Sequence, residues 1–239
     1  MTNNIKLTPN VGAELQPTSV AGIARAIVKD SEKRFDLTWD RFCRIDTTAK
    51  SVREIANPSK SILDVGGFDG ALALFLPEFT IDVIDPETTG GTGFDITENS
   101  YDVVVSIDAL EHIEPALRKV FLNSTIKAAR NQCFINFPSQ RSAVAQSLVY
   151  ELTKNPLVHD HVKWELPDAR EVAAQMKSVG FSTQIFEHTS IAQWVSQYLL
   201  QTFNANAAAK ASRYVLENHI DEAAATCLYD LIVGKKDAN

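Results

Sequence analysis

Residues 61–137 alternate between short apolar runs and longer stretches with helical periodicity. The apolar runs are 61–65, 80–84, 101–107 and 132–137, and the helical stretches between them are 70–76 and 115–130. Strands made of unbroken apolar runs are typical of a parallel sheet that helices cover on both faces. The pattern therefore predicts an α/β fold.

The pattern continues less regularly after residue 137. We expect an insertion at about 139–166, and then a helix that begins at Asp168 with Glu171 as its capping-box partner. Residues 181–188 are predicted to form a strand, and 227–236 the closing strand. The segment between them, about 190–225, has the periodicity of amphipathic helices, which we expect to form a lid together with the first insertion.

The first 57 residues carry apolar positions at helical spacing. These positions are Val20, Ile23, Ala24, Ile27 and Val28, followed by Trp39, Phe42, Cys43, Val52, Ile55 and Ala56. Pro58 is expected to end this region. We therefore predict a helical cap over residues 1–57 and a main domain over residues 58–239.

Composition narrows the class of protein. The chain has 239 residues, of which 45% are hydrophobic, and only three are cysteines, without a CxxC motif. Its apolar runs are shorter than the roughly 18 residues that cross a bilayer, and its polar start does not resemble a signal peptide. These features predict a cytoplasmic protein with reduced thiols and no membrane partner.

The net charge of −7 is concentrated in the middle of the chain. Residues 61–139 hold 4 Lys and Arg against 12 Asp and Glu. A nucleic-acid partner needs a basic face that displaces counterions from phosphates. The acidic middle segment therefore argues against nucleic acid.

The most informative segment is ILDVGGFDG, residues 62–70, where an apolar strand leads through a glycine turn into a helix. Gly66 and Gly67 permit unusual backbone dihedrals and a close approach of a ligand. The free N–H groups at the helix start are suited to a carboxylate or phosphate. An ordinary strand–helix turn is the alternative.

Asp85 follows the next apolar run, 21 residues after Asp64. An acidic residue about 20 residues beyond a glycine turn is the usual partner of ribose hydroxyls in nucleotide-binding α/β proteins. Its charge also disfavours a 2′-phosphorylated cofactor. Together the two segments predict a nucleotide-like ligand.

Five segments in this order resemble class I S-adenosylmethionine-dependent methyltransferases of the small-molecule type. They are LDVGGFDG (63–70), VIDPE (83–87), FDI (94–96), YDVVVSIDALEHI (101–113) and FINFPS (134–139). The resemblance implies a Rossmann-like, mostly parallel sheet of seven strands whose last strand is antiparallel, with extra helices at the N-terminus and before the last strand. It also implies S-adenosylmethionine as the cofactor. The methyl acceptor is expected to be an O or N atom of a small molecule or glycan.

The resemblance also assigns cofactor contacts. The methionine part would lie against 66–70, the ribose against Asp85, and the adenine against Asp95 and Ile96. The expected set is Asp64, Gly66, Gly67, Phe68, Gly70, Asp85, Pro86, Asp95, Ile96, Ser106 and Asp108. Phe68 departs from the family pattern, which has glycine at this position, and this leaves a non-catalytic cofactor-binding protein as an alternative.

A general base is needed only for a hydroxyl or a protonated amine acceptor. His112 and His161 are the candidates, because imidazole titrates near neutral pH, although His112 also suits a structural role. Asp108, Glu111, His112 and His161 resemble the ligand set of metal-dependent RNA 2′-O-methyltransferases. Because LEHI also occurs in relatives without metal, we expect no metal and retain these four residues as the alternative.

Two further features remain open. Trp194, Tyr198 and Phe203 fit either an acceptor pocket or core packing. Tyr150 and Lys154 form a Y-x-x-x-K motif with Ser139 upstream, as in NAD-dependent short-chain dehydrogenases. That family places its glycine loop much farther from the tyrosine, so we interpret this motif as a coincidence. An NAD-dependent oxidoreductase is kept only as an alternative function. The sequence does not predict the oligomeric state.

Overall fold

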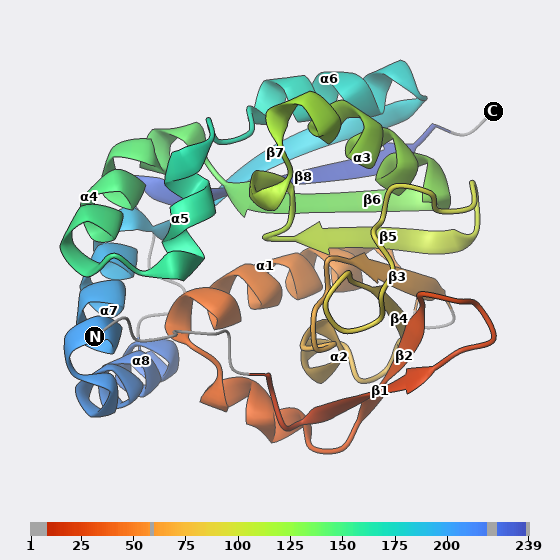
Figure 1. The fold of residues 1–239 in the computed structure, drawn as a ribbon. Coiled ribbons are helices and arrows are strands. Elements are labelled where there is room, and N and C mark those ends of the chain that lie inside the picture. The colour runs from red at the N-terminus through yellow and green to blue at the C-terminus, as the bar shows by residue number, and fades with distance from the viewer. Residues whose placement is uncertain (1–8, 58–59, 219–223, 238–239) are drawn as a thin grey trace.

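The computed structural model describes residues 9–57, 60–218 and 224–237. Its described residues form one mixed sheet with the strand order β1-β2-β4-β3-β5-β6-β8-β7 (Figure 1). The strands are β1 (Ala13–Pro17), β2 (Ala24–Val28), β3 (Ser61–Val65), β4 (Thr80–Ile84), β5 (Tyr101–Ile107), β6 (Ala129–Pro138), β7 (Phe181–Ser190) and β8 (Cys227–Lys236).

The centre of the sheet confirms the α/β prediction. Strands β4, β3, β5 and β6 are mutually parallel, and β8 runs antiparallel to both β6 and β7. The bounds of β3, β4, β5 and β8 coincide with the apolar runs in the sequence. The sheet has eight strands in the described residues rather than the expected seven.

Six of these strands correspond to strands predicted from the sequence, and the other two come from the N-terminal segment, where the helical prediction for residues 20–28 is wrong. β1 and β2 form an antiparallel hairpin, and β2 pairs with β4 at the sheet edge. Arg25 fixes this edge through two hydrogen bonds to the Asp82 carboxylate, at 2.8 and 3.1 Å. A short apolar segment fits both periodicities, and tertiary pairing decided between them. Pro58 lies outside the described residues, and the domain boundary at residue 57 stays a prediction.

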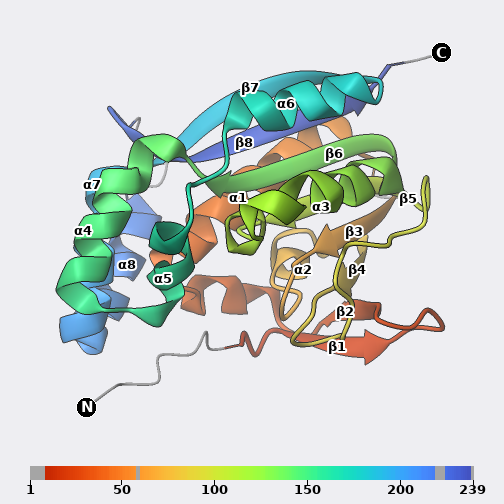
Figure 2. The same ribbon diagram turned by 45° about the horizontal axis from the view of Figure 1, so that its top comes forward.

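Helices cover both faces of the sheet (Figures 1 and 2). α3 (Pro115–Ala128) and α6 (Ala169–Ser178) lie on one face, and α1 (Trp39–Ile55) and the single turn α2 (Leu72–Phe75) lie on the other. Each face buries its own apolar cluster. α6 begins as predicted, with the Asp168 carboxylate accepting from the N–H groups of Arg170 and Glu171. Three short 3₁₀ helices complete this part: η1 (Ser31–Asp36), η2 (Leu110–His112) and η3 (Gln140–Ser142).

Four helices gather beyond the carboxyl ends of β5 and β6 (Figure 1). They are α4 (Ala143–Thr153), α5 (Pro156–Lys163), α7 (Ile191–Phe203) and α8 (Ala205–Asn218). They come from the two segments that the sequence predicts as lid insertions, and residues 219–223 of the second lie outside the described residues. Among the described residues, no helix is long and apolar enough to span a membrane.

Candidate functional site

A cavity of about 900 Å³ lies between the carboxyl ends of the central strands and this helical group. Ligands of open α/β sheets bind at this edge. Its wall combines the glycine turn and the end of β4 with side chains from α1, η2, α5, α7 and β8. The residues that line it include Asp40, Arg41, Arg44, Asp64, Gly66, Gly67, Phe68, Asp85, Pro86, Thr92, Asp108, His112, His161, Trp194, Tyr198 and Tyr229.

The glycine turn has a backbone that L-residues rarely adopt. Gly66 and Gly70 have φ values of 80° and 75°, and Phe68 between them has 46°. A Cβ atom on Gly66 would lie 2.6 Å from the Cβ of Ala109, so glycine is required there for space as well as for φ. Phe68 therefore takes the left-handed conformation that glycine would adopt without strain, and its ring lies on the cavity wall.

Asp64 is an incompletely paired acid on this wall. The residue is 3% exposed, and its Oδ1 atom has no hydrogen-bond partner. Burial raises the pKa of the Asp64 carboxyl to about 7, and the negative charges of Asp69 and Asp85 add to the rise. An unpaired buried carboxylate is costly, so this position is suited to a positively charged ligand group.

Asp85 holds the loop after β4 while it lines the cavity. Its Oδ1 accepts hydrogen bonds from the N–H groups of Glu87 and Thr88, and its Oδ2 accepts one from Phe68 at 3.3 Å. The acid thus ties the glycine turn to the next strand. One oxygen with a single long hydrogen bond retains capacity for a ligand hydroxyl.

Four of the predicted cofactor residues are not on the cavity wall. Gly70 packs against the N-terminal hairpin, where a Cβ would lie 2.9 Å from that of Ala26. The Ser106 hydroxyl donates to the Val65 carbonyl, Ile96 belongs to an apolar cluster, and Asp95 is exposed. Cofactor contact by these four stays a prediction that the cavity does not support, whereas Thr92, which the sequence did not indicate, lies on the wall.

The expected anion site at the start of α2 is wrong. The Asp69 carboxylate occupies this position, and its Oδ1 accepts from the Ala71 N–H at 3.1 Å. The same carboxylate pairs with Arg41 at 2.5 Å. Because the Asp69 carboxylate already accepts a hydrogen bond at the start of α2, its negative charge disfavours binding of a second anion there. In addition, α2 is a single turn and has only a small helix dipole.

The opposite wall contains a buried ion-pair network that the sequence did not reveal. Arg44 of α1 pairs with Asp40 at 2.8 Å and with Asp108 at 2.9 Å, and it donates to the Tyr229 hydroxyl at 3.2 Å. Burial acts to raise the pKa of Asp108, but the positive charge of Arg44, together with His161, His112 and a hydrogen bond from Glu111, outweighs it and the pKa falls to about 2. Asp108 is therefore ionised and tied to α1. In the sequence, the available signal was that Asp40 and Arg44 lie one helical turn apart, beside the apolar positions Trp39, Phe42 and Cys43.

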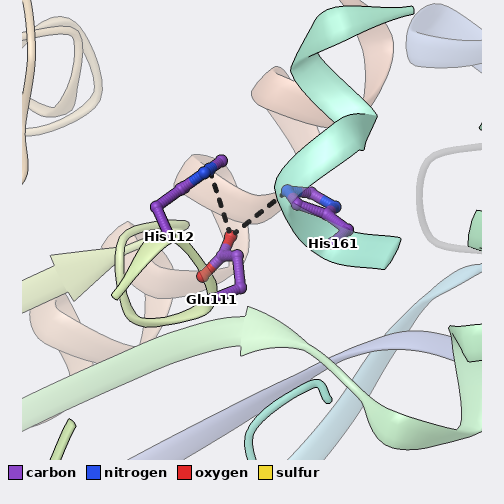
Figure 3. Close-up of side chains that lie close together, drawn as sticks. All are labelled: Glu111, His112 and His161. Atoms are coloured by element: carbon purple, nitrogen blue, oxygen red, sulfur yellow. Dashed lines mark ion pairs between the residues drawn. The ribbon is translucent and has the colours of Figure 1, made fainter. Parts of the chain in front are cut away.

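Glu111, His112 and His161 form a cluster beside this network (Figure 3). One Glu111 oxygen lies 4.0 Å from His112 Nε2 and 3.9 Å from His161 Nε2. Burial, together with the Asp108 charge, raises the pKa of Glu111 well above its ordinary value. Burial lowers the pKa of His161 to about 4, so this imidazole is neutral at pH 7. Both histidines line the cavity. The structure thus unites three of the four residues named as a metal alternative, while Asp108 pairs with Arg44.

The remaining candidates divide clearly. Trp194 and Tyr198 lie on the cavity wall, whereas Phe203 is 71% exposed and away from it. Tyr150 and Lys154 do not line the cavity, and the Lys154 ammonium contacts the Tyr150 ring and pairs with Glu151. The dehydrogenase-like motif therefore has no catalytic setting in this cavity.

No family model and no curated protein matches this chain. Among solved structures, one from Galdieria sulphuraria, provisionally described as a sarcosine dimethylglycine methyltransferase, has a TM-score of 0.50 and 14% identity, covering 84% of this chain and 86% of its own. The magnesium protoporphyrin IX methyltransferase of Synechocystis PCC 6803, with bound SAH, has a TM-score of 0.49 and 9% identity over 87% and 86%. The [4+2]-cyclase SpnF has a TM-score of 0.49 and 11% sequence identity, and the match covers 81% of this chain and 81% of SpnF.

At such identities the similarity shows the fold alone. This chain has the fold of the Galdieria structure, which confirms the resemblance to class I methyltransferases at the level of architecture. A fold hosts many chemistries, so the activity has to be argued from the cavity.

Proposed function

We propose that this protein is a methyltransferase that moves a methyl group from S-adenosylmethionine to an O or N atom of a small molecule held in the 900 Å³ cavity. The observation that carries the proposal is Asp64, a buried carboxyl with an unpartnered oxygen on the wall beside the glycine turn. This position requires a positive charge or a proton. The cofactor carries an ammonium and a sulfonium, so it supplies such a charge.

The residues present fit this cofactor. The backbone from Gly66 to Phe68 would border the methionine part, with Asp64 facing the ammonium. Asp85 and Pro86 follow β4 and line the same cavity, so the Asp85 oxygen with spare capacity would accept a ribose hydroxyl. Thr92 is the nearest candidate for the adenine side, in place of Asp95 and Ile96.

The cofactor brings a reactive methyl group, so the protein's main tasks are to align the acceptor and to exclude water. Trp194 and Tyr198 of α7 supply an apolar wall for the second task. His112 is the candidate base, because its imidazole lies on the wall while its Nδ1 contacts Asp160 at 3.2 Å. His161, predicted as the other base, is buried and neutral, which suits a ligand better than a proton carrier.

Calorimetric titration with S-adenosylmethionine, S-adenosylhomocysteine and NAD in turn tests the proposal. We expect binding of the first two at micromolar concentrations and no heat with NAD. Binding of NAD alone would overturn the proposal in favour of an oxidoreductase, and the absence of heat with all three ligands would overturn it as well.

Matched variants locate the binding. Asp85→Asn keeps an oxygen for the N–H groups of Glu87 and Thr88 but removes the charge, and we expect it to weaken S-adenosylhomocysteine binding at least tenfold. Glu98→Gln, an exposed acid paired with Lys127, is the control and should bind as the wild type does. Asp95→Asn tests whether Asp95 contacts the cofactor. If this variant binds S-adenosylhomocysteine as tightly as wild type, Asp95 is not a cofactor contact.

A further inference from the structure

Three potential ligand atoms converge at one place on the cavity wall. His112 and Glu111 come from η2, and His161 comes from α5, so the cluster joins two segments about 50 residues apart (Figure 3). Their ligand atoms all lie within 4.8 Å of one another. No positively charged side chain is hydrogen-bonded to the Glu111 carboxylate among the described residues.

Among the described residues, the atoms that face one another accept no hydrogen bond, and the Glu111 carboxyl interacts with the neighbouring Asp108 carboxylate. Glu111 is 0% exposed, and neither of its oxygens accepts a hydrogen bond. His161 is 8% exposed, and its Nε2 atom is also unpartnered. Native proteins rarely leave buried polar atoms in this condition, and here two such groups point at each other.

The outer nitrogens of both imidazoles are held by acceptors. His112 Nδ1 lies 3.2 Å from an Asp160 carboxylate oxygen, and His161 Nδ1 lies 3.2 Å from the Gln146 amide oxygen. Each Nδ1 therefore carries the hydrogen and donates it, which leaves the lone pair of each Nε2 directed at Glu111. Two lone pairs facing a carboxylate repel it unless a metal ion or a proton lies between them. Histidine metal ligands are held in place by such acceptors.

We infer that Glu111, His112 and His161 bind one divalent first-row transition metal ion, with Asp160 and Gln146 orienting the two imidazoles. Two nitrogen ligands and one carboxylate favour ions such as Zn²⁺, Fe²⁺ or Co²⁺ over Mg²⁺ and Ca²⁺, which prefer oxygen. The inference concerns binding of the ion and holds whether or not the proposed methyl transfer does. With the ion bound, His112 is a ligand, so it cannot also act as the candidate base.

The geometry needs only a small closure to hold the ion. Metal–ligand bonds of about 2.0–2.2 Å separate tetrahedral ligands by roughly 3.4 Å, whereas the ligand atoms of Glu111 and each histidine are 3.9–4.0 Å apart. The ligand atoms of the cluster are separated by up to 4.8 Å, so side-chain shifts of up to about 1 Å close the site around an ion. Because both histidines line the cavity, a fourth coordination position would face the space available to a small molecule.

Chelator-treated protein titrated with Co²⁺ tests the inference, because tetrahedral Co²⁺ absorbs visible light and calorimetry gives the stoichiometry. We expect one equivalent to bind at micromolar concentration and to raise Tm, and Mg²⁺ to bind at least 100-fold more weakly. Glu111→Gln keeps the shape of the side chain and should lower the Co²⁺ affinity at least 100-fold, as should His161→Gln.

The control is His159→Gln, which changes an exposed histidine on the same helix, and it should bind Co²⁺ as the wild type does. The alternative is that Glu111 is protonated and that no metal ion lies between the three side chains. In that case wild-type protein shows no Co²⁺ spectrum or Tm shift, and Glu111→Gln is as stable as wild type, which would overturn the inference. Titration of the chelated protein with S-adenosylhomocysteine keeps this outcome separate from a failure of the proposed function.

Discussion

The two ends of the cavity are built on different principles. At the glycine turn, the backbone is held in left-handed conformations at Gly66 and Phe68, and the neighbouring Asp64 has an oxygen without a partner among the described residues. At the opposite end, residues from five separate elements form the wall, and Arg44 pairs there with two carboxylates.

We expect the two ends of the cavity to contribute differently to ligand affinity and to folding stability. The glycine turn stores strain and unpaired charge that a ligand can relieve, so changes there should affect affinity more than folding. Arg44 neutralises the two buried carboxylates of Asp40 and Asp108, although Asp108 Oδ1 has no hydrogen-bond partner among the described residues. Because removing Arg44 would leave both charges buried without a cation, changes there should affect folding first.

Arg44→Met should be the most destabilising change. It leaves the carboxylates of Asp40 and Asp108 buried without their cation, which typically costs about 3–5 kcal/mol. Urea unfolding at pH 7 measures this loss. Lys127→Met is the control, because Lys127 and Glu98 form an exposed pair and its loss should cost less than about 1 kcal/mol. Equal losses for both variants would contradict a stabilising role for the buried Arg44 ion pairs.

Asp64 predicts a pH dependence at the other end. Its pKa rises from 3.8 to about 7 on folding, so between these values the native protein holds a proton that the unfolded chain has released. The free energy of unfolding therefore falls as pH rises through this window, by at most about 4 kcal/mol. Asp64→Asn removes this dependence, so the variant should gain stability relative to wild type between pH 4.5 and pH 7.5.

Urea unfolding of both proteins at the two pH values measures the gain. Asp95→Asn, at an exposed acid, is the control and should follow the wild type. If the stability difference between Asp64→Asn and wild type is the same at both pH values, then Asp64 is paired in solution and the unpaired-charge argument is wrong. At pH 7.5 we also expect Asp64→Asn to bind S-adenosylhomocysteine more weakly, despite its greater stability.

The contrast also explains how much the sequence could predict. The glycine turn, Asp85 and the strands β3, β4 and β5 follow one another within 50 residues, so local patterns sufficed for them. The Arg44 network joins α1 to residues 108 and 229, and nothing in local spacing indicates such a contact. Likewise, the pairing of β2 with β4 is a tertiary contact, and this pairing decided the structure of residues 24–28.

Gly66→Ala tests the strained backbone. The new Cβ would meet the Ala109 Cβ at 2.6 Å, and φ is 80°, so the loop has to shift. We expect a loss of about 1–3 kcal/mol in stability and a larger proportional loss of S-adenosylhomocysteine binding, more than 30-fold by calorimetry. Gly180→Ala is the matched control, because Gly180 has φ 88° but open space around its Cβ position. If both variants bind equally well, the shape of the turn does not determine affinity.

The smallest effect is expected at Phe68. The residue already has the left-handed φ of 46° that glycine adopts without strain. Phe68→Gly relieves roughly 1 kcal/mol of backbone strain but loses the ring's contacts at the cavity, so stability should change by less than about 1 kcal/mol. If the turn is a cofactor site, S-adenosylhomocysteine affinity should stay within threefold of wild type. A tenfold or larger increase in S-adenosylhomocysteine affinity would show that the ring obstructs the cofactor site. It would then favour the alternative that this protein does not catalyse methyl transfer.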